Sequence, residues 1–115
     1  MTLFKSGDVV LVGFPFTDLS GTKQRPSLVI SSDWYNENKP DAILSAITSQ
    51  IPDKIDEDEY LLSPAEQKSA GLPKKSIVKV GKIITLDQRL IRKKLGRLPD
   101  ETLSNIKNIL LKIHI

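Results

Sequence analysis

The chain has 115 residues, a formal net charge of +3 and no cysteine. This length predicts a single domain, residues 1–115, with a modest core. Without cysteine, disulfides and thiolate metal sites are excluded, and the single histidine, His114, cannot by itself build a histidine metal site or a catalytic triad. The longest apolar runs are far shorter than the roughly 18 residues that span a bilayer, and residues 1–5 lack the apolar region of a signal peptide, so we expect a cytosolic protein that does not enter a membrane.

Charge is distributed unevenly along the chain. Residues 1–67 hold 5 Lys and Arg against 11 Asp and Glu, a net charge of −6, whereas residues 68–97 hold 10 against the single Asp87, a net charge of +9. Clustered positive charge favours a polyanionic partner, because each neutralised phosphate releases condensed counterions. A solvated, lysine-rich surface is the alternative interpretation of the same residues.

The first half of the chain alternates apolar runs with polar segments. We expect a central strand over Phe4–Phe16 that is buried on both faces, and Pro15 within it indicates a bulge or a sheet edge. A second strand over residues 26–32, a polar turn over 33–40 and a third strand over 42–47 follow. Phe14 and Phe16 fit the core best, and stacking on nucleic-acid bases is the alternative.

The second half begins with an acidic loop at residues 53–59, where five carboxylates surround one lysine and one isoleucine. We expect this loop to be solvated and mobile, and its spacing does not suit a hard cation, so no metal site is predicted. The remaining elements are predicted in this order: a short strand at 60–62, a helical turn from 63, two short strands within 76–86 separated at Gly81, a turn or short helix at 87–95, and a C-terminal helix from Pro99 to Ile113.

The predicted elements fix the fold class. Five or more short strands with one amphipathic C-terminal helix indicate a mainly β protein. No strand–helix alternation repeats along the chain, so a small, strongly curved antiparallel sheet is expected rather than a parallel one. The apolar stripe of the C-terminal helix should pack on this sheet.

The polar loop at residues 17–24 is the first candidate for ligand contact. It is longer than the two to five residues of a usual hairpin loop, and Asp18, Ser20 and Lys23 offer small polar or charged groups to base edges and sugar hydroxyls. An ordinary mobile connector is the alternative. Arg25 closes the loop where the second strand begins, a position at which Pro26 need not donate a hydrogen bond. Its planar, permanently charged guanidinium suits a phosphate.

A second polar group ends the third strand. Thr48, Ser49 and Gln50 place three hydroxyl or amide side chains in a row. If this strand ends near the start of the second strand, Thr48 and Arg25 come to lie on one side of the sheet. The sequence leaves open whether they meet.

These residues resemble the PemK/MazF family of toxin endoribonucleases. The N-terminal motif is the specific part, and a looser match continues through the second half. The matching segments are Gly7–Val10, Phe14–Gly21, Arg25–Pro26, Leu28–Ser31, Ile47–Gln50, Gly71–Pro73, Val78–Lys79, Ile84–Asp87 and Leu95–Leu98.

The resemblance implies an SH3-like β-barrel with a C-terminal α-helix. It further implies a homodimeric toxin of a type II toxin-antitoxin system that cuts single-stranded RNA without metal or cofactor, is neutralised by a cognate acidic antitoxin, and binds DNA in complex with it. Arg25 and Thr48 match the residues assigned to catalysis in the family. The residues expected to contact RNA are Asp18, Ser20, Lys23, Gln24, Ser49, Gln50, Lys79 and Lys82.

RNA cleavage without metal uses the 2′-hydroxyl as nucleophile and leaves a 2′,3′-cyclic phosphate, or its opened 3′-phosphate, and a 5′-hydroxyl. The protein then has to supply positioning, charge stabilisation and proton transfer. Arg25 suits the charged phosphorane but is a poor general base, because its pKa is too high, so the proton acceptor stays unassigned. Thr48 is suited to hydrogen bonding with a phosphate oxygen.

Two departures from the family pattern bear on activity. Gln24 stands where some members have a histidine or an acidic residue, and Gly81 aligns loosely with a glutamine of other members. Two alternative functions therefore stay open: a toxin that poisons DNA gyrase on the same barrel, and a catalytically silent RNA-binding or regulatory protein. Retention of both Arg25 and Thr48 argues against the gyrase alternative.

Overall fold

The computed structural model describes residues 4–13 and 24–114. The predictions made for residues 14–23, including the loop positions Asp18, Ser20 and Lys23, lie outside the described residues. The described elements are β1 (Asp8–Gly13), β2 (Gln24–Val29), α1 (Asp33–Asn38), β3 (Asp41–Thr48), β4 (Glu59–Leu61), α2 (Pro64–Ser69), β5 (Ile77–Asp87), the 3₁₀ helix η1 (Gln88–Leu90), β6 (Ile91–Arg97) and α3 (Asp100–His114).

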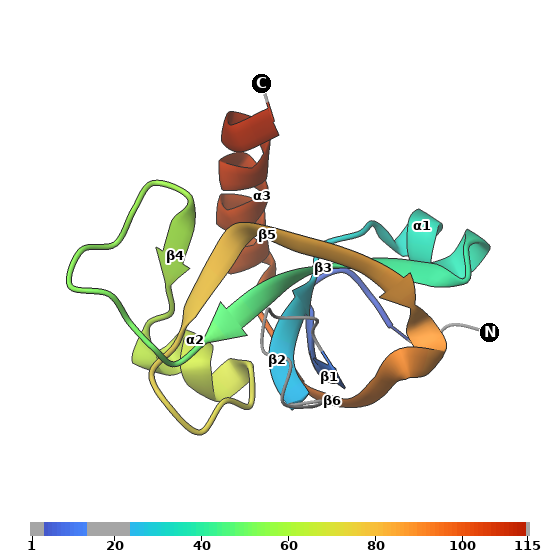
Figure 1. The fold of residues 1–115 in the computed structure, drawn as a ribbon, viewed down its shortest axis with the longest axis horizontal. Helices are drawn as coiled ribbons and strands as arrows, with labels where there is room; N and C mark the ends of the chain where they lie inside the picture. Colours follow the sequence, from blue (N-terminus) through green and yellow to red (C-terminus); the bar gives the residue numbers. More distant parts are fainter. Residues whose placement is uncertain (1–3, 14–23, 115) are drawn as a thin grey trace.

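The six strands form one antiparallel sheet in the order β4-β5-β3-β2-β1-β6. Figure 1 shows how the sheet curls, with β5 and β3 arching over β2, β1 and β6. In the described part of the chain, β4 and β6 are the two edges, so the curl is barrel-like without closing. This confirms the predicted mainly β class and the strongly curved antiparallel sheet.

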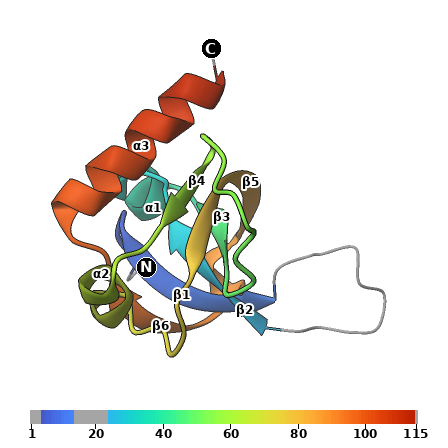
Figure 2. The same ribbon diagram turned by 90° about the vertical axis from the view of Figure 1, so that its left-hand side faces the viewer.

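Two apolar cores lie on opposite faces of the sheet. Successive residues of β1 point to opposite faces, which puts Val9 in one core and Val10 in the other, and both are fully buried. The first core is covered by α3 through Leu103 and Ile106 (Figure 2). Among the described residues, the second core is built from residues of β1, β2, β3, β5 and β6 and contains none from α3. The prediction that the first strand is buried on both faces is therefore confirmed.

Helix α3 begins just after Pro99, whose carbonyl accepts the first helical hydrogen bond from the Leu103 N–H at 3.0 Å. The predicted amphipathic helix is confirmed, with one difference at its end. Ile113 belongs to the predicted apolar stripe but is 42% exposed, although its Cδ1 lies beside Gly81 of β5, 3.2 Å from where a Cβ would stand. No helix in the described residues is long and apolar enough to cross a membrane.

Residues 33–40 contain a helix, α1, where the sequence predicted a turn. Ser32 supplies the N-cap, because its hydroxyl accepts a hydrogen bond from the Tyr35 N–H at 3.1 Å. The prediction is wrong because the polar composition of this segment resembles a turn, although a serine followed by Asp33 is also a helix start.

The two short strands predicted within residues 76–86 are one strand, β5, with an irregularity at the predicted break. Opposite β3, the partner changes from Ile83 to Lys79 between the neighbouring residues Ser45 and Ala46. The residues between Lys79 and Ile83, Gly81 among them, are the excess that forms this bulge. The bulge therefore lies where the sequence predicted a break between two strands, but β5 continues through it as one strand.

The sequence predicts a turn or short helix at residues 87–95. The 3₁₀ helix η1 confirms this for residues 88–90, but the basic residues that follow form a strand, β6, which was not predicted. It pairs with β1 at the edge of the sheet and exposes Arg92, Lys93 and Lys94. Charged side chains on an edge strand oppose pairing with another chain, so a basic strand is reasonable at this position.

Two glycines allow α2 to pack against β6. Gly71 follows α2 with a φ of +71°, and a Cβ built on it would lie 2.0 Å from the Leu95 carbonyl oxygen. A Cβ on Gly96 would lie 2.4 Å from the Ser69 carbonyl oxygen. The loosely matching motifs at residues 71–73 and 95–98 therefore meet in a backbone contact that only glycine permits.

Candidate functional site

Arg25 and Thr48 lie on the same face of neighbouring strands. The β2–β3 ladder pairs Ser27 with Ala46, and side chains two residues apart on a strand share a face. Arg25 is therefore on the face of Ser27, and Thr48 on the face of Ala46. The paired part of the β2–β3 ladder ends at Ser27 and Ala46, so Arg25 and Thr48 lie just beyond it on this face. Both are partly buried.

The same face continues onto β5, the next strand. Thr48 is paired with Ile77, and Ala46 with Lys79, without a bulge between these two pairs. Lys79 is consequently the diagonal neighbour of Thr48, one strand over and on the same side of the sheet. Three residues predicted from sequence, Arg25, Thr48 and Lys79, come from three adjacent strands to one face.

The residues after Thr48 leave the sheet in a tight turn. The Thr48 hydroxyl accepts a hydrogen bond from the Gln50 N–H at 3.1 Å, and both Ser49 and Gln50 are exposed. Gln50 and Lys79 line one surface pocket of about 400 Å³. The pocket gives this end of the sheet a concave surface bordered by the Gln50 amide, the ammonium groups of Lys54 and Lys79, and the carboxylates of Asp56 and Glu59.

The other predicted contact residues are distributed less closely. Gln24 is exposed at the start of β2, next to Arg25. Lys82 is exposed in the bulge of β5, beyond the register that aligns Lys79 with β3. Ser49 and Gln50 thus follow Thr48 directly, and Lys79 shares its face on the next strand. Lys82 lies outside this group.

The basic stretch 68–97 is not one continuous charged surface. Its lysines and arginines are spread over α2, the following loop, β5, η1 and β6, and several contact carboxylates. Lys94 and Arg97 reach the fully buried Asp8 at 3.2 and 3.3 Å. Arg89 forms a bidentate contact with Asp87 that holds the pKa of this carboxyl below its usual value. Part of the net charge therefore stabilises the fold and is not available to a polyanion.

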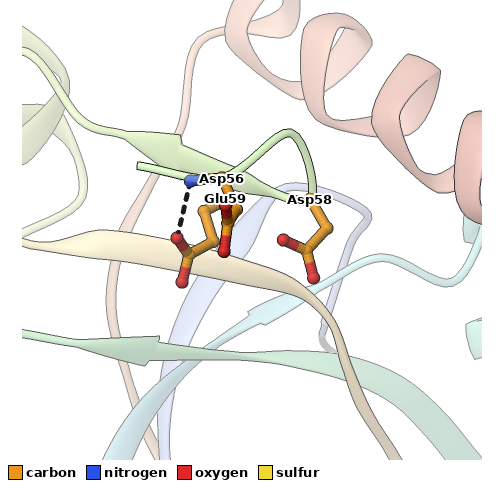
Figure 3. A group of neighbouring side chains, drawn as sticks. All are labelled: Asp56, Asp58 and Glu59. Carbon is orange, nitrogen blue, oxygen red and sulfur yellow. Dashed lines mark hydrogen bonds between the residues drawn. The ribbon is translucent and has the colours of Figure 1, made fainter. Parts of the chain in front are cut away.

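The acidic loop ends in a group of neighbouring carboxylates. Figure 3 shows Asp56, Asp58 and Glu59, whose carboxylate oxygens lie within 4.8 Å of one another. The Asp56 N–H donates to Glu59 at 2.9 Å, and Lys79 lies 3.4 Å from Glu59. Sequence reasoning missed Glu59, since nothing in the acidic run indicated that its last member begins β4.

The carboxylate of Glu66 links three elements and is not part of the Arg25–Thr48 pair. It accepts hydrogen bonds from the Tyr60 hydroxyl of β4, the Thr102 hydroxyl of α3 and the Ser63 N–H. Burial by itself would raise the pKa of Glu66, but the hydrogen bonds from Ser63, Thr102 and Tyr60 outweigh it, so the pKa is lowered. This group connects α2 and α3 to the sheet edge.

Comparison with known proteins now decides the family. The family described as "PemK-like, MazF-like toxin of type II toxin-antitoxin system" matches residues 5–114. The chain belongs to this family. A curated relative, Endoribonuclease EndoA of Bacillus subtilis (strain 168), is 32% identical over 119 residues, which cover 94% of this chain and 91% of the relative.

Solved PemK/MazF-type structures share the fold. MazF from Deinococcus radiodurans (Form-I) superposes with a TM-score of 0.76 at 22% identity, covering 99% of this chain and 98% of MazF. An endoribonuclease from a mycobacterial species, solved in complex with its cognate antitoxin, gives a TM-score of 0.73 at 20% identity, with 94% and 91% covered. The curled sheet and C-terminal helix are thus the family fold.

Proposed function

We propose that this PemK/MazF-type toxin is an endoribonuclease that cleaves single-stranded RNA and thereby inhibits translation and growth. The observation that most supports this proposal is the position of Arg25 and Thr48 on one face of β2 and β3. The family membership and the 32% identity to EndoA support the reaction class. We further propose that residues 1–115 act as a single toxin domain in the cytoplasm.

In the proposed reaction, the 2′-oxygen bonds to the adjacent phosphorus as the 2′-hydroxyl loses its proton to solvent. The bond from phosphorus to the 5′-oxygen breaks, and the 5′-oxygen takes up a proton from solvent. Arg25 holds two phosphate oxygens with its planar fork and balances the charge of the phosphorane. Thr48 donates a hydrogen bond to a phosphate oxygen or to the leaving 5′-oxygen. These roles supply the positive charge and the hydrogen bonds without metal, and the products are a 2′,3′-cyclic phosphate, or the 3′-phosphate formed from it, and a 5′-hydroxyl.

RNA contacts are proposed around this pair. Ser49 and Gln50 are exposed directly after Thr48, and Lys79 lies on the neighbouring strand. Base edges and sugar hydroxyls are suited to the amide and hydroxyl groups, whereas Lys79 suits a phosphate. The remaining proposed contacts are Asp18, Ser20, Lys23, Gln24 and Lys82.

Two protein partners complete the proposal. The toxin acts as a homodimer, and a cognate acidic antitoxin covers the RNA site in competition with RNA. Support comes from the family and from the mycobacterial relative, whose structure contains its antitoxin. Sedimentation at micromolar concentration tests the dimer, and a monomer would contradict it.

Sequencing the 5′ ends that the purified protein produces on a mixed RNA pool tests the function. We expect cuts at a short recurring sequence, together with no effect on DNA gyrase supercoiling. Inhibition of gyrase without RNA cleavage would favour a gyrase toxin. Binding of RNA without cleavage would favour a silent RNA-binding protein, and either result would overturn the proposal.

A further inference from the structure

Lys79 is the cation next to Thr48 on the proposed RNA face, and it is paired within the protein. It stands opposite Glu59 in the β4–β5 ladder, with 3.4 Å between its ammonium nitrogen and the carboxylate. The Lys79 side chain is 44% exposed, whereas that of Glu59 is only 7% exposed. Lys79 thus covers the carboxylate and presents its outer side to solvent.

Glu59 is held in this position by its own loop. Its Oε1 accepts a hydrogen bond from the Asp56 N–H at 2.9 Å, and its N–H donates to the Asp56 carbonyl at 3.1 Å. The Asp56 and Asp58 carboxylates lie beside it (Figure 3). An RNA phosphate that approaches Lys79 through the adjoining pocket therefore meets the carboxylates of Asp56 and Glu59 as well as the ammonium groups of Lys54 and Lys79, which all line the pocket.

We propose that Glu59 is a specificity-determining residue. It keeps Lys79 neutralised until an RNA phosphate replaces the Glu59 carboxylate beside the lysine. The inference rests on the proposed RNA-cleaving function. In the free protein, the ion pair weakens attraction for any polyanion that passes over the site. An RNA molecule gains the Lys79 contact only if it places a phosphate close enough to compete with Glu59. Loosely docked RNA therefore gains little affinity from Lys79.

A second ion pair from the same loop offers a matched control. Glu57 lies 3.2 Å from Lys112 of α3, and both side chains are well exposed. Glu57→Gln removes the same charge from the same acidic loop as Glu59→Gln. It releases a lysine on the C-terminal helix, however, whereas Glu59→Gln releases one on the face of Thr48. The two variants separate the effect of total charge from the effect of the Lys79 pair.

The test measures binding of a mixed-sequence, single-stranded 2′-O-methyl RNA, which cannot be cleaved through its 2′ position, at several salt concentrations. We expect Glu59→Gln to bind about five to ten times more tightly than wild type near 0.1 M salt. In a plot of log affinity against log salt concentration, the slope for Glu59→Gln should be steeper than that of wild type by about 0.7. This is the value for one additional phosphate contact on a single-stranded nucleic acid. Glu57→Gln should stay within about twofold of wild type.

A double variant shows whether Glu59 acts through Lys79. In a Lys79→Gln background, Glu59→Gln should give no gain in affinity and no change in salt slope. Equal effects of Glu59→Gln and Glu57→Gln, or a gain that persists without Lys79, would overturn the proposal. Glu59→Asp keeps the charge on a shorter side chain, and a partial gain is expected from it if Glu59→Gln fails to fold.

This experiment is independent of cleavage. Wild-type protein that cuts natural RNA while Glu59→Gln binds no better would refute the role of Glu59 and leave the function standing. Tighter binding by Glu59→Gln in a protein that cuts no RNA would refute the function and leave the ion-pair proposal standing.

Discussion

Arg25 of β2 and Thr48 of β3 lie on one face of two antiparallel strands, because each stands two residues beyond a member of the Ser27–Ala46 pair. The paired part of the β2–β3 ladder ends at Ser27 and Ala46, so Arg25 and Thr48 lie just beyond it, at the ends of their strands. A shift of the register by one residue would move one of the two side chains to the other face and end this arrangement.

Replacement of Arg25 tests the proposed charge stabilisation. We expect Arg25→Ala to lower the cleavage rate at least about 100-fold, as expected for loss of a donor to a developing oxyanion. Arg25→Lys should also be severely impaired, because it keeps the charge but loses the planar fork. The control is Arg92→Ala, which removes an exposed arginine from edge strand β6. Near-normal cleavage by Arg25→Ala would refute the site assignment.

Replacement of Thr48 separates its hydroxyl from its shape. Thr48→Ala should reduce cleavage strongly and leave the melting temperature nearly unchanged, because the side chain is only partly buried. Thr48→Ser retains the hydroxyl and should recover most of the activity. Thr85→Ala removes an exposed threonine from β5 and serves as the control. Equal rates for Thr48→Ala and wild type in single-turnover assays would show that the hydroxyl has no part in the reaction.

Glu66 makes stability depend on pH in a defined direction. Its pKa is lowered in the folded state, since hydrogen bonds from Ser63, Thr102 and Tyr60 outweigh the effect of burial. Its contribution is therefore present above the unfolded pKa of about 4.3 and is lost as the pH falls through the folded pKa.

Thermal melting of wild type and Glu66→Gln between pH 7 and pH 3 measures this contribution. The variant should be less stable near neutral pH, and the difference should shrink below about pH 4. The exposed Glu37→Gln of α1 is the control. A difference that grows as the pH falls would contradict the sign.

Substitution of Gly71 by alanine should have a large steric effect, and the same substitution at Gly13 is the control. Gly71→Ala has to accommodate a φ of +71° and a Cβ 2.0 Å from the Leu95 carbonyl oxygen. The left-handed conformation alone costs about 1–2 kcal/mol, and the clash adds to it. Gly13→Ala meets nothing within 4 Å and should change stability by less than about 0.5 kcal/mol. Denaturant unfolding of both variants checks the prediction, and equal midpoints would refute it.

Much of the fold could be predicted from local sequence patterns. The run that forms β1, the proline and carboxylates at the start of α3, and the Ser63–Glu66 capping box of α2 all act within a few residues. Strand β6 could not be predicted in this way, because its basic residues are favourable only at a sheet edge, and edge position is a property of the whole fold.

The site divides in a similar manner. Arg25 and Thr48 were identifiable as polar residues at strand ends, but their common face follows from the β2–β3 register, which no local pattern fixes. The Lys79–Glu59 pair depends on β4 lying beside β5. Glu59 therefore looked like one more carboxylate of a solvated loop.

Chemical analysis of the RNA ends, made by mass spectrometry after cleavage in EDTA, tests the central claim most directly. Attack by the 2′-hydroxyl predicts a 2′,3′-cyclic phosphate or 3′-phosphate, a 5′-hydroxyl, and no cleavage when the 2′-hydroxyl at the cut position is replaced by hydrogen. Products with a 5′-phosphate, or activity lost in EDTA and restored by Mg²⁺, would show that metal-activated water is the nucleophile and would contradict the roles given to Arg25 and Thr48.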